Sequence, residues 1–262
     1  MQENPVKILS NRCVASDTFL LQLGSPELAA SARPGQFLMV RVNDSIDPVL
    51  RRPFSVCGTE EGGIVKILYK VVGRGTKFLS DKKEGEFISV LGPLGKGFMT
   101  TDLPESSILV GGGIGIAPLM FLYRHLETSD SIFLTGFRTS DEIIDPASAG
   151  NNIEAVIATD DGSMGFSGRV TDLLIKKLEL YNQGETGIYA CGPLPMLKAV
   201  AGISVKYGIP CQVSMETFMA CGLGVCQGCV IRAESTAVNR QYLHVCKEGP
   251  VFDINEIDWK NV

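Results

Sequence analysis

Four cysteines near the C-terminal end of this 262-residue chain constrain its fold more than any other feature. Three of them, Cys221, Cys226 and Cys229, follow the spacing C-x4-C-x2-C, and Cys246 follows after sixteen further residues. A plant-type [2Fe-2S] cluster takes three thiolates from one tight loop and a fourth from a distant segment. Glycines stand between the three cysteines, and residues without a Cβ allow the backbone to approach sulfur closely. The spacing therefore predicts a [2Fe-2S] site with these four cysteines as ligands.

Zinc is the main alternative for these cysteines. Structural zinc sites usually combine two short-spaced ligand pairs, and only Cys226 with Cys229 forms such a pair here. His244 stands two residues before Cys246, an awkward spacing for a substitute ligand. Disulfides are disfavoured because the N-terminal residues lack the basic-then-apolar pattern of an export signal. We therefore expect a cytoplasmic location, where thiols bind metal or stay reduced.

Composition indicates a folded enzyme and argues against several kinds of partner. Hydrophobic residues make up 45% and charged residues 20% of the sequence, with 29 glycines, which is typical of an α/β or β-rich protein. The net charge of −5, without a block of Lys or Arg, argues against nucleic acid or an anionic membrane as partner. The uncharged stretch 106–123 approaches the length of a membrane span, but its four glycines and Pro118 predict a strand, a turn and a helix of a soluble domain.

The first hundred residues predict an antiparallel β-barrel. Short apolar segments separated by turn signals fill residues 6–90, and strands are expected at 18–23, 36–42, 64–72 and 87–91. Two short motifs in this region could bind a flavin. The segment RRPFS at 51–55 combines guanidiniums for a phosphate with an aromatic ring and a hydroxyl for the flavin ring.

The second motif, YKVVGRGT at 69–76, reads as a strand that enters a glycine turn. The amides of this turn and the Thr76 hydroxyl could hold a pyrophosphate at the start of a helix. Each motif alone is a weak signal, because Arg-Arg-Pro usually forms a solvated corner and Gly-x-Gly a plain turn.

The middle hundred residues predict a nucleotide-binding α/β domain. Residues 107–110 predict a buried strand, followed by GGGIGIAP at 111–118 and a helix at 119–126. Glycines at this point allow a dinucleotide phosphate to approach the helix N-terminus, and Pro118 fits the first helical turn. Strands at 131–135, 153–159 and 187–190 alternate with helices at 170–181 and 195–207. This alternation predicts a doubly wound parallel sheet.

Cofactors on such sheets bind beyond the carboxyl ends of the strands. Two segments occupy such ends, DDGS at 160–163 and CGP at 191–193. The Cys191 thiol could lie near a nicotinamide ring, or it could simply be a small residue that precedes a helix.

Five motifs together resemble the ferredoxin–NADP reductase superfamily. They are RPFS at 52–55, GRGT at 73–76, LGPLG at 91–95, GGGIGIAP at 111–118 and CGP at 191–193. The resemblance covers residues 5 to about 213 and implies FAD on the barrel and a pyridine nucleotide on the α/β domain. The expected organisation is an FAD-binding β-barrel domain over residues 1–100, an NAD-binding α/β domain over 101–213 and a [2Fe-2S] segment over 214–262.

The C-terminal segments 215–229 and 246–252 are similar to those of the electron-transfer subunits of type B dihydroorotate dehydrogenases. The resemblance implies an FMN-bearing catalytic partner subunit, in a heterotetramer with two copies of each chain. Electrons from dihydroorotate would pass from FMN to the cluster, to FAD and to NAD, in pyrimidine biosynthesis. A flavin suits the position between a one-electron cluster and a two-electron nicotinamide. No catalytic acid or base is expected in this chain.

By this match, the expected FAD contacts are Arg52, Pro53, Phe54, Ser55, Tyr69, Lys70, Val71, Gly75 and Thr76. The expected dinucleotide contacts are Gly113, Gly115, Pro118, Cys191, Gly192 and Pro193. NAD is preferred over NADP on family grounds, although Arg138 could meet a 2′-phosphate or be a surface charge. The alternatives are a related subunit of a hydrogenase, sulfite reductase or ferredoxin–NADP reductase complex, and a non-catalytic module that holds zinc.

Overall fold

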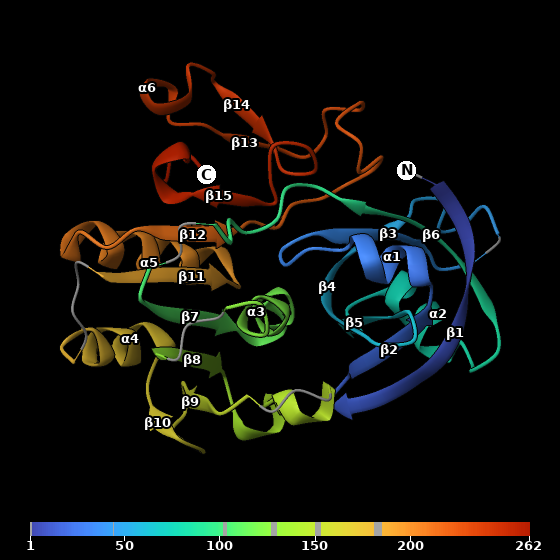
Figure 1. The fold of residues 1–262 in the computed structure, drawn as a ribbon, viewed down its shortest axis with the longest axis horizontal. Helices are drawn as coiled ribbons and strands as arrows, with labels where there is room; N and C mark the ends of the chain where they lie inside the picture. The colour runs from blue at the N-terminus through green and yellow to red at the C-terminus, as the bar shows by residue number, and fades with distance from the viewer. Residues whose placement is uncertain (1, 44, 102–103, 127–129, 150–152, 181–184) are drawn as a thin grey trace.

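A computed structural model describes residues 2–43, 45–101, 104–126, 130–149, 153–180 and 185–262. Within them the chain forms a closed barrel, a seven-stranded sheet with helices on both faces, and a C-terminal hairpin segment beside them (Figure 1). The predicted fold class is confirmed. No helix within these ranges has the length and apolar character needed to cross a membrane.

The barrel has the strand order β1-β2-β5-β4-β3-β6, and all neighbouring strands are antiparallel. Its strands are β1 (Gln2–Ala15), β2 (Thr18–Gly24), β3 (Phe37–Arg41), β4 (Arg52–Glu60), β5 (Ile64–Lys70) and β6 (Phe87–Leu94). Helices α1 (Pro26–Ser31) and α2 (Arg74–Asp81) lie in its connections. Leu21, Leu23, Val65 and Ile67 pack in its core. Because the barrel is closed, its core is lined by strands from the whole N-terminal third of the chain.

The large sheet has the order β10-β9-β8-β7-β11-β12-β15, and only β15 runs antiparallel to its neighbour. Its strands are β7 (Ser106–Gly112), β8 (Asp130–Phe137), β9 (Ala155–Thr159), β10 (Phe166–Ser167), β11 (Thr186–Cys191), β12 (Cys211–Ser214) and β15 (Val251–Asp253). The covering helices are α3 (Ile116–Tyr123), α4 (Val170–Leu178) and α5 (Leu194–Tyr207).

Strand β7 shows why this sheet needs helices on both faces. All of its residues are buried. Ile108 and Val110 belong to the apolar cluster that contains α4 and α5 residues, whereas Leu109 belongs to the cluster around α3. A strand covered on both faces is apolar throughout rather than alternating, as the sequence indicated.

The C-terminal segment leaves the sheet after β12 and later returns to it. It contains the cysteine loop, the hairpin strands β13 (Val230–Arg232) and β14 (Tyr242–His244), and the short helix α6 (Ser235–Val238). Strand β15 then pairs with β12, so the segment completes the edge of the nucleotide-domain sheet. Figure 1 shows this segment lying beside both the sheet and the barrel.

Candidate redox cofactor sites

The four predicted cluster cysteines lie in two close pairs. Cys229 Sγ lies 3.1 Å from Cys246 Sγ, and both residues are buried. The backbone N–H of Cys226 donates to Cys221 Sγ at 3.4 Å, and Cys226 is exposed. Gly224 N–H donates to Cys246 Sγ at 3.1 Å, so the loop of the first three cysteines also contacts the fourth. Amides directed at sulfur are the arrangement expected around an anionic cluster.

The chemistry of this donor set fits an iron–sulfur cluster. Burial raises the pKa of the Cys221 thiol, but hydrogen bonds from the amides of Cys226 and Leu223 outweigh it and lower the pKa to about 6. The thiolate is the form that binds metal. Within the described ranges, no three Cys, His, Asp or Glu residues surround a single metal position. Two pairs of thiolates suit a cluster with two iron atoms better than one zinc ion.

The cysteine loop packs directly against the barrel. A Cβ on Gly222 would lie 2.7 Å from Met39 Cγ, so only glycine fits there without displacing the β3 side chain. Met39 pairs in register with Pro53 on β4, within the RPFS motif. A second contact joins Gly95 at the end of β6 to the Gly249–Pro250 turn. The loop of the predicted cluster cysteines therefore contacts β3, the strand that pairs with the strand carrying the predicted flavin motif.

Of the two adjacent arginines, Arg52 contacts the glycine turn of the predicted flavin site. A Cβ on Gly75 would lie 2.8 Å from Arg52 Nε, which places this guanidinium against the start of α2. Arg51 instead donates to Ser89, at 3.0 Å to its carbonyl oxygen and 2.9 Å to its hydroxyl. Arg52 and the first amides of α2 thus form one cationic, amide-rich surface that suits a pyrophosphate.

Other residues of the predicted flavin site stabilise its backbone or pack against one another. The Thr76 hydroxyl accepts from the Val72 and Gly73 amides at 3.0 and 3.2 Å, so it fixes the turn. The Tyr69 side chain is buried within the barrel, and its hydroxyl donates to Asn11 Oδ1 at 3.0 Å, while Tyr69 pairs in register with Phe19 on β2. Phe54 packs on the Tyr69 ring, with centroids 5.6 Å apart.

Three further predicted positions have a similar exposure. Pro53 and Ser55 are half-buried on β4, next to Phe54, and Val71 is half-buried beyond the end of β5. The Lys70 side chain lines the dinucleotide cavity, described next, rather than the surface around Arg52.

A cavity of about 720 Å³ lies beyond the carboxyl ends of the central strands. Gly113, Gly115, Gly192 and Pro193, four of the expected dinucleotide contacts, line it. The glycine loop forms a 3₁₀ turn that leads into α3. The position at the strand ends and the glycine-rich wall both suit a dinucleotide.

Pro118 and Cys191 support this cavity without lining it. Both are buried, Pro118 within the first turn of α3 and Cys191 at the end of β11. A Cβ on Gly115 would overlap the Cys191 carbonyl oxygen and lie 2.7 Å from Gly192 Cα. Burial raises the pKa of the Cys191 thiol, with a further contribution from Glu216. These two residues therefore shape the wall and do not present a reactive group to the cavity.

The sequence pointed to Asp160 at a strand end, but not to Glu142 or Glu216, the other acidic residues that line the cavity. Glu142 bridges Arg138 and Lys70, with 2.9 Å to Arg138 Nη2 and 3.3 Å to Lys70 Nζ. Lys70 belongs to the barrel and Glu142 follows β8, so this ion pair joins the two domains. Glu142 is part of the sequence SDE at 140–142, which carries no recognisable motif.

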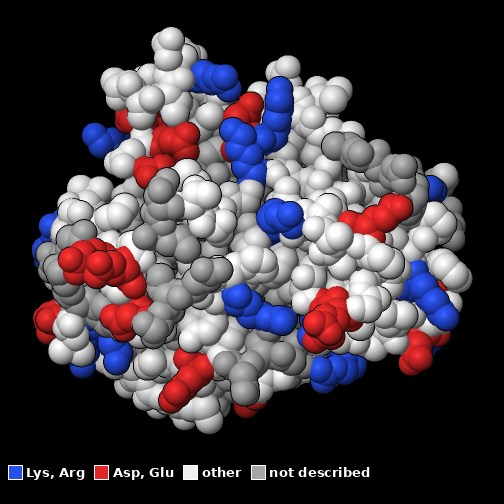
Figure 2. Space-filling model, in the orientation of Figure 1, with Lys and Arg blue, Asp and Glu red and all other residues white. Residues whose placement is uncertain are grey.

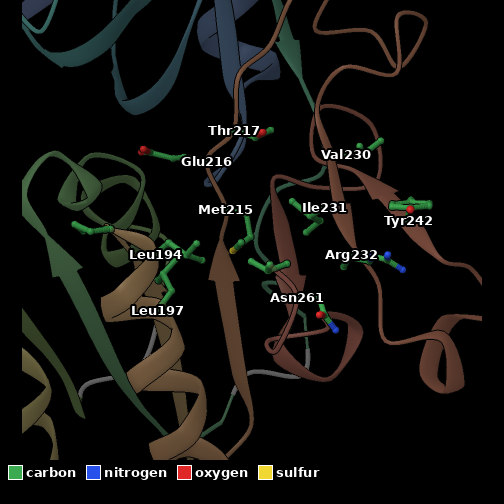
Figure 3. A pocket seen from close by; sticks show the side chains of 13 residues that line it. Leu194, Leu197, Met215, Glu216, Thr217, Val230, Ile231, Arg232, Tyr242 and Asn261 are labelled. Atoms are coloured by element: carbon green, nitrogen blue, oxygen red, sulfur yellow. The ribbon is translucent and has the colours of Figure 1, made fainter.

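A second cavity of about 490 Å³ lies between α5 and the β13–β14 hairpin (Figure 3). Leu197 and Ile231 face it from opposite sides. Glu216 lines both cavities, and Figure 3 shows its side chain directed away from the hairpin. Burial raises the pKa of this carboxyl. Glu216 stands only five residues before Cys221, so the segment that lines the dinucleotide cavity leads directly into the cysteine loop.

Family models match three consecutive parts of the chain. An oxidoreductase FAD-binding domain matches residues 5–98, an oxidoreductase NAD-binding domain matches 109–202, and the iron–sulfur cluster binding domain of dihydroorotate dehydrogenase B matches 216–258. The chain is 36% identical over 261 residues to the dihydroorotate dehydrogenase B (NAD(+)) electron transfer subunit of Desulforamulus reducens, with 97% of each chain covered. The protein of the same name from Geobacillus thermodenitrificans is 38% identical over 256 residues, with 95% of this chain and 96% of that protein covered.

The chain belongs to the dihydroorotate dehydrogenase B electron transfer subunit family. This electron transfer subunit is also similar to a chain in the structure of an NADH-dependent reduced ferredoxin–NADP oxidoreductase, with a TM-score of 0.82 and 31% identity. That match covers 97% of this chain and 90% of the other. A ferredoxin reductase of carbazole 1,9a-dioxygenase shares the fold, with a TM-score of 0.68, 23% identity, and coverage of 80% of this chain and 67% of the other.

These matches confirm that the electron transfer subunit carries FAD-, NAD- and iron–sulfur-binding domains in that order. They favour the dihydroorotate dehydrogenase interpretation over the related hydrogenase, sulfite reductase and ferredoxin–NADP reductase subunits, because the C-terminal domain model is specific to dihydroorotate dehydrogenase B.

Proposed function

We propose that this subunit passes electrons from the FMN of a dihydroorotate dehydrogenase catalytic subunit, through a [2Fe-2S] cluster and FAD, to NAD⁺. The observation that carries the proposal is the contact of the cysteine loop with the barrel. Gly222 packs on Met39, and Met39 pairs in register with Pro53 of the flavin motif. This contact gives a short path between a cluster on Cys221, Cys226, Cys229 and Cys246 and a flavin on β4.

Each cofactor would be held by a different part of the chain. Arg52 and the α2 amides would bind the FAD pyrophosphate, with the flavin ring on the β4 segment Pro53–Ser55 and the backbone of residues 69–71. Gly113, Gly115, Gly192 and Pro193 would line the NAD site. When bound, a flavin exchanges single electrons with a cluster and electron pairs with nicotinamide. The protein's task is to fix these positions and exclude water. We assign the three functions to residues 1–100, 101–213 and 214–262.

An apolar surface beside the cluster loop supports docking of a catalytic subunit there. Phe218 is 96% exposed and Val225 is 77% exposed, and Leu223 lies between two cluster cysteines in sequence. Exposed aromatic and aliphatic residues grouped at one site are typical of protein interfaces. The exposed Cys226 would then face the partner. We propose a cytoplasmic heterotetramer with two copies of each chain. The face in Figure 2 carries interspersed charges of both signs.

The test is co-expression with a dihydroorotate dehydrogenase catalytic subunit, followed by cofactor analysis and an assay of dihydroorotate-dependent NAD⁺ reduction. We expect FAD and two iron atoms per electron transfer subunit, FMN on the partner, and NADH formation. Cys226→Ser should abolish the cluster signal and the NADH formation while FAD and NADH–dye activity remain. A complex that lacks iron, or a Cys226→Ser variant with full dihydroorotate-to-NAD⁺ activity, would refute the proposal.

A further inference from the structure

The side chain of Lys247 lies along the cysteine loop. Lys247 directly follows Cys246 in sequence, and Gly224 stands in the loop between Cys221 and Cys226. A Cβ on Gly224 would lie 2.8 Å from Lys247 Cδ, 3.1 Å from Lys247 Cβ and 3.3 Å from Lys247 Cγ, so the lysine chain packs on the loop backbone. Because only two bonds separate Cδ from the amino nitrogen, this packing keeps the ammonium group next to the loop.

The same part of the loop contacts the proposed fourth cluster ligand. The Gly224 N–H donates to Cys246 Sγ at 3.1 Å, and the φ of Gly224, +75°, lies in the left-handed region that favours glycine. Lys247 is therefore fixed twice beside the cysteines, by the peptide bond to Cys246 and by its packing on Gly224. A cluster with thiolate ligands from these cysteines would have the ammonium charge as a close neighbour.

The charge of Lys247 is not taken up by an ion pair within the described ranges of the chain. Lys247 is exposed, and none of the ion pairs in these ranges includes it. The adjacent Glu248 has other partners: it accepts from the His244 amide and ring, and its Oε1 lies 3.5 Å from Arg240 Nη1. Because Arg240 balances the charge of Glu248, Lys247 leaves a positive surplus beside Cys246.

We infer that Lys247 raises the reduction potential of the [2Fe-2S] cluster by stabilising its reduced form. Reduction adds one electron without forming or breaking a bond, and it makes the thiolate-ligated cluster more negative. A fixed positive charge nearby favours the more negative form, and net charge is one of the factors that set the potential of such clusters. In the proposed function the electron comes from the FMN of the partner subunit, so Lys247 makes the cluster a better acceptor for it. The inference rests on that proposed function.

The experiment measures the reduction potential of the cluster in the purified complex, by redox titration followed by electron paramagnetic resonance. Lys247→Met removes the charge and keeps an unbranched chain that can pack on Gly224. We expect the equilibrium between the two forms of the cluster to shift about three- to tenfold toward the oxidised form, which lowers the potential of this one-electron couple by about 28–59 mV. Lys247→Arg keeps the charge and should retain the wild-type potential.

Salt dependence separates an effect of charge from a change of structure. Salt shortens the range of exposed charges from about 10 Å at 0.1 M to about 3 Å at 1 M, so the potentials of Lys247→Met and wild type should converge at 1 M salt. The control variant Lys206→Met removes the same charge from the last turn of α5 and should leave the potential unchanged.

Three results would overturn the inference while the cluster and the proposed function remain. They are an unchanged potential in Lys247→Met, an equal shift in Lys247→Arg or Lys206→Met, and a difference from wild type that persists at 1 M salt. A wild-type complex without iron would instead contradict the proposed function.

Discussion

Replacing Gly115 with alanine tests how the dinucleotide cavity is held together. The backbone of Gly115 has φ −63° and ψ −9°, which any residue adopts, so the substitution causes no conformational strain. The difficulty is space. The new Cβ would overlap the Cys191 carbonyl oxygen and lie 2.7 Å from Gly192 Cα. Both obstacles are backbone atoms at the end of β11, so they cannot rotate away as a side chain would.

The expected magnitude follows from these contacts. Carbon atoms normally approach to about 3.5–4.0 Å, so the glycine loop and the end of β11 must separate by about 1 Å. Overpacking of this kind costs about 1–3 kcal/mol, and each kcal/mol lowers Tm by about 2–4 °C in a protein of this size. Because Gly115 and Gly192 both line the cavity, a displacement near 1 Å should also lower kcat/KM for NADH by about 10–100-fold.

Gly113→Ala is the matched control. Gly113 lines the same cavity, but a Cβ there meets nothing within 4 Å, and its φ of +53° adds a strain cost of about 1–2 kcal/mol. Thermal unfolding and NADH–dye kinetics of both variants distinguish the two effects. Gly113→Ala should lose stability without moving the end of β11, so its loss of NADH activity should be the smaller one. An unchanged Tm and an unchanged NADH kcat/KM in Gly115→Ala would refute the steric explanation.

Two further predictions concern the other cofactor sites. Glu248 accepts hydrogen bonds from the His244 backbone amide at 2.7 Å and from its ring Nδ1 at 3.1 Å, and these contacts close the turn that carries Cys246. The Glu248→Ala variant should therefore lose its cluster to a chelator about 10–100-fold more readily than wild type, as measured by visible absorbance. The Glu248→Gln variant keeps an acceptor and should behave like wild type; equal cluster loss in Glu248→Ala and wild type would contradict a role for the turn. The Arg52→Ala variant should bind FAD more weakly by about 1.5–3 kcal/mol, measured by flavin titration of the apoprotein. The control variant Arg51→Ala removes contacts to Ser89 instead and should retain its FAD affinity. Equal losses of affinity in the two variants would contradict the assignment of Arg52 to the FAD pyrophosphate.

Features encoded by local spacing were predictable from the sequence. The cysteines of the loop lie within nine residues, so their pattern alone indicates a cluster, and the glycine loop stands between a strand and a helix that each have a clear apolar pattern. Strands β1 and β4 were not predicted. Strand β4 begins with Arg52 and Pro53, residues that favour turns, and only pairing with β3 and β5 makes this segment a strand. The closed strand order likewise depends on contacts between distant segments.

The charge arrangement of the dinucleotide cavity was beyond the reach of local patterns for the same reason. Lys70 and Glu142 are 72 residues apart, and each stands in a stretch with other charged residues nearby. Nothing in the sequence distinguishes Glu142 from its neighbour Asp141, which lies outside the cavity. Pairings between domains depend on how the barrel and the sheet dock, so the ion pair between Lys70 and Glu142 appears only when both domains are in place.

The C-terminal segment explains how three cofactor sites can be kept at fixed separations in one chain. A cluster domain tied by a single linker would move relative to the flavin, and electron transfer would then depend on that motion. Here the segment is attached at both ends and in its middle: it leaves from β12, Gly222 packs on Met39 of the barrel, and β15 returns to pair with β12. The Gly249–Pro250 turn between Cys246 and β15 also contacts Gly95 of the barrel. The same short stretch that carries Cys246, the proposed fourth ligand, therefore joins the barrel to the sheet, so loss of β15 should loosen the cluster, the flavin domain and the nucleotide domain together.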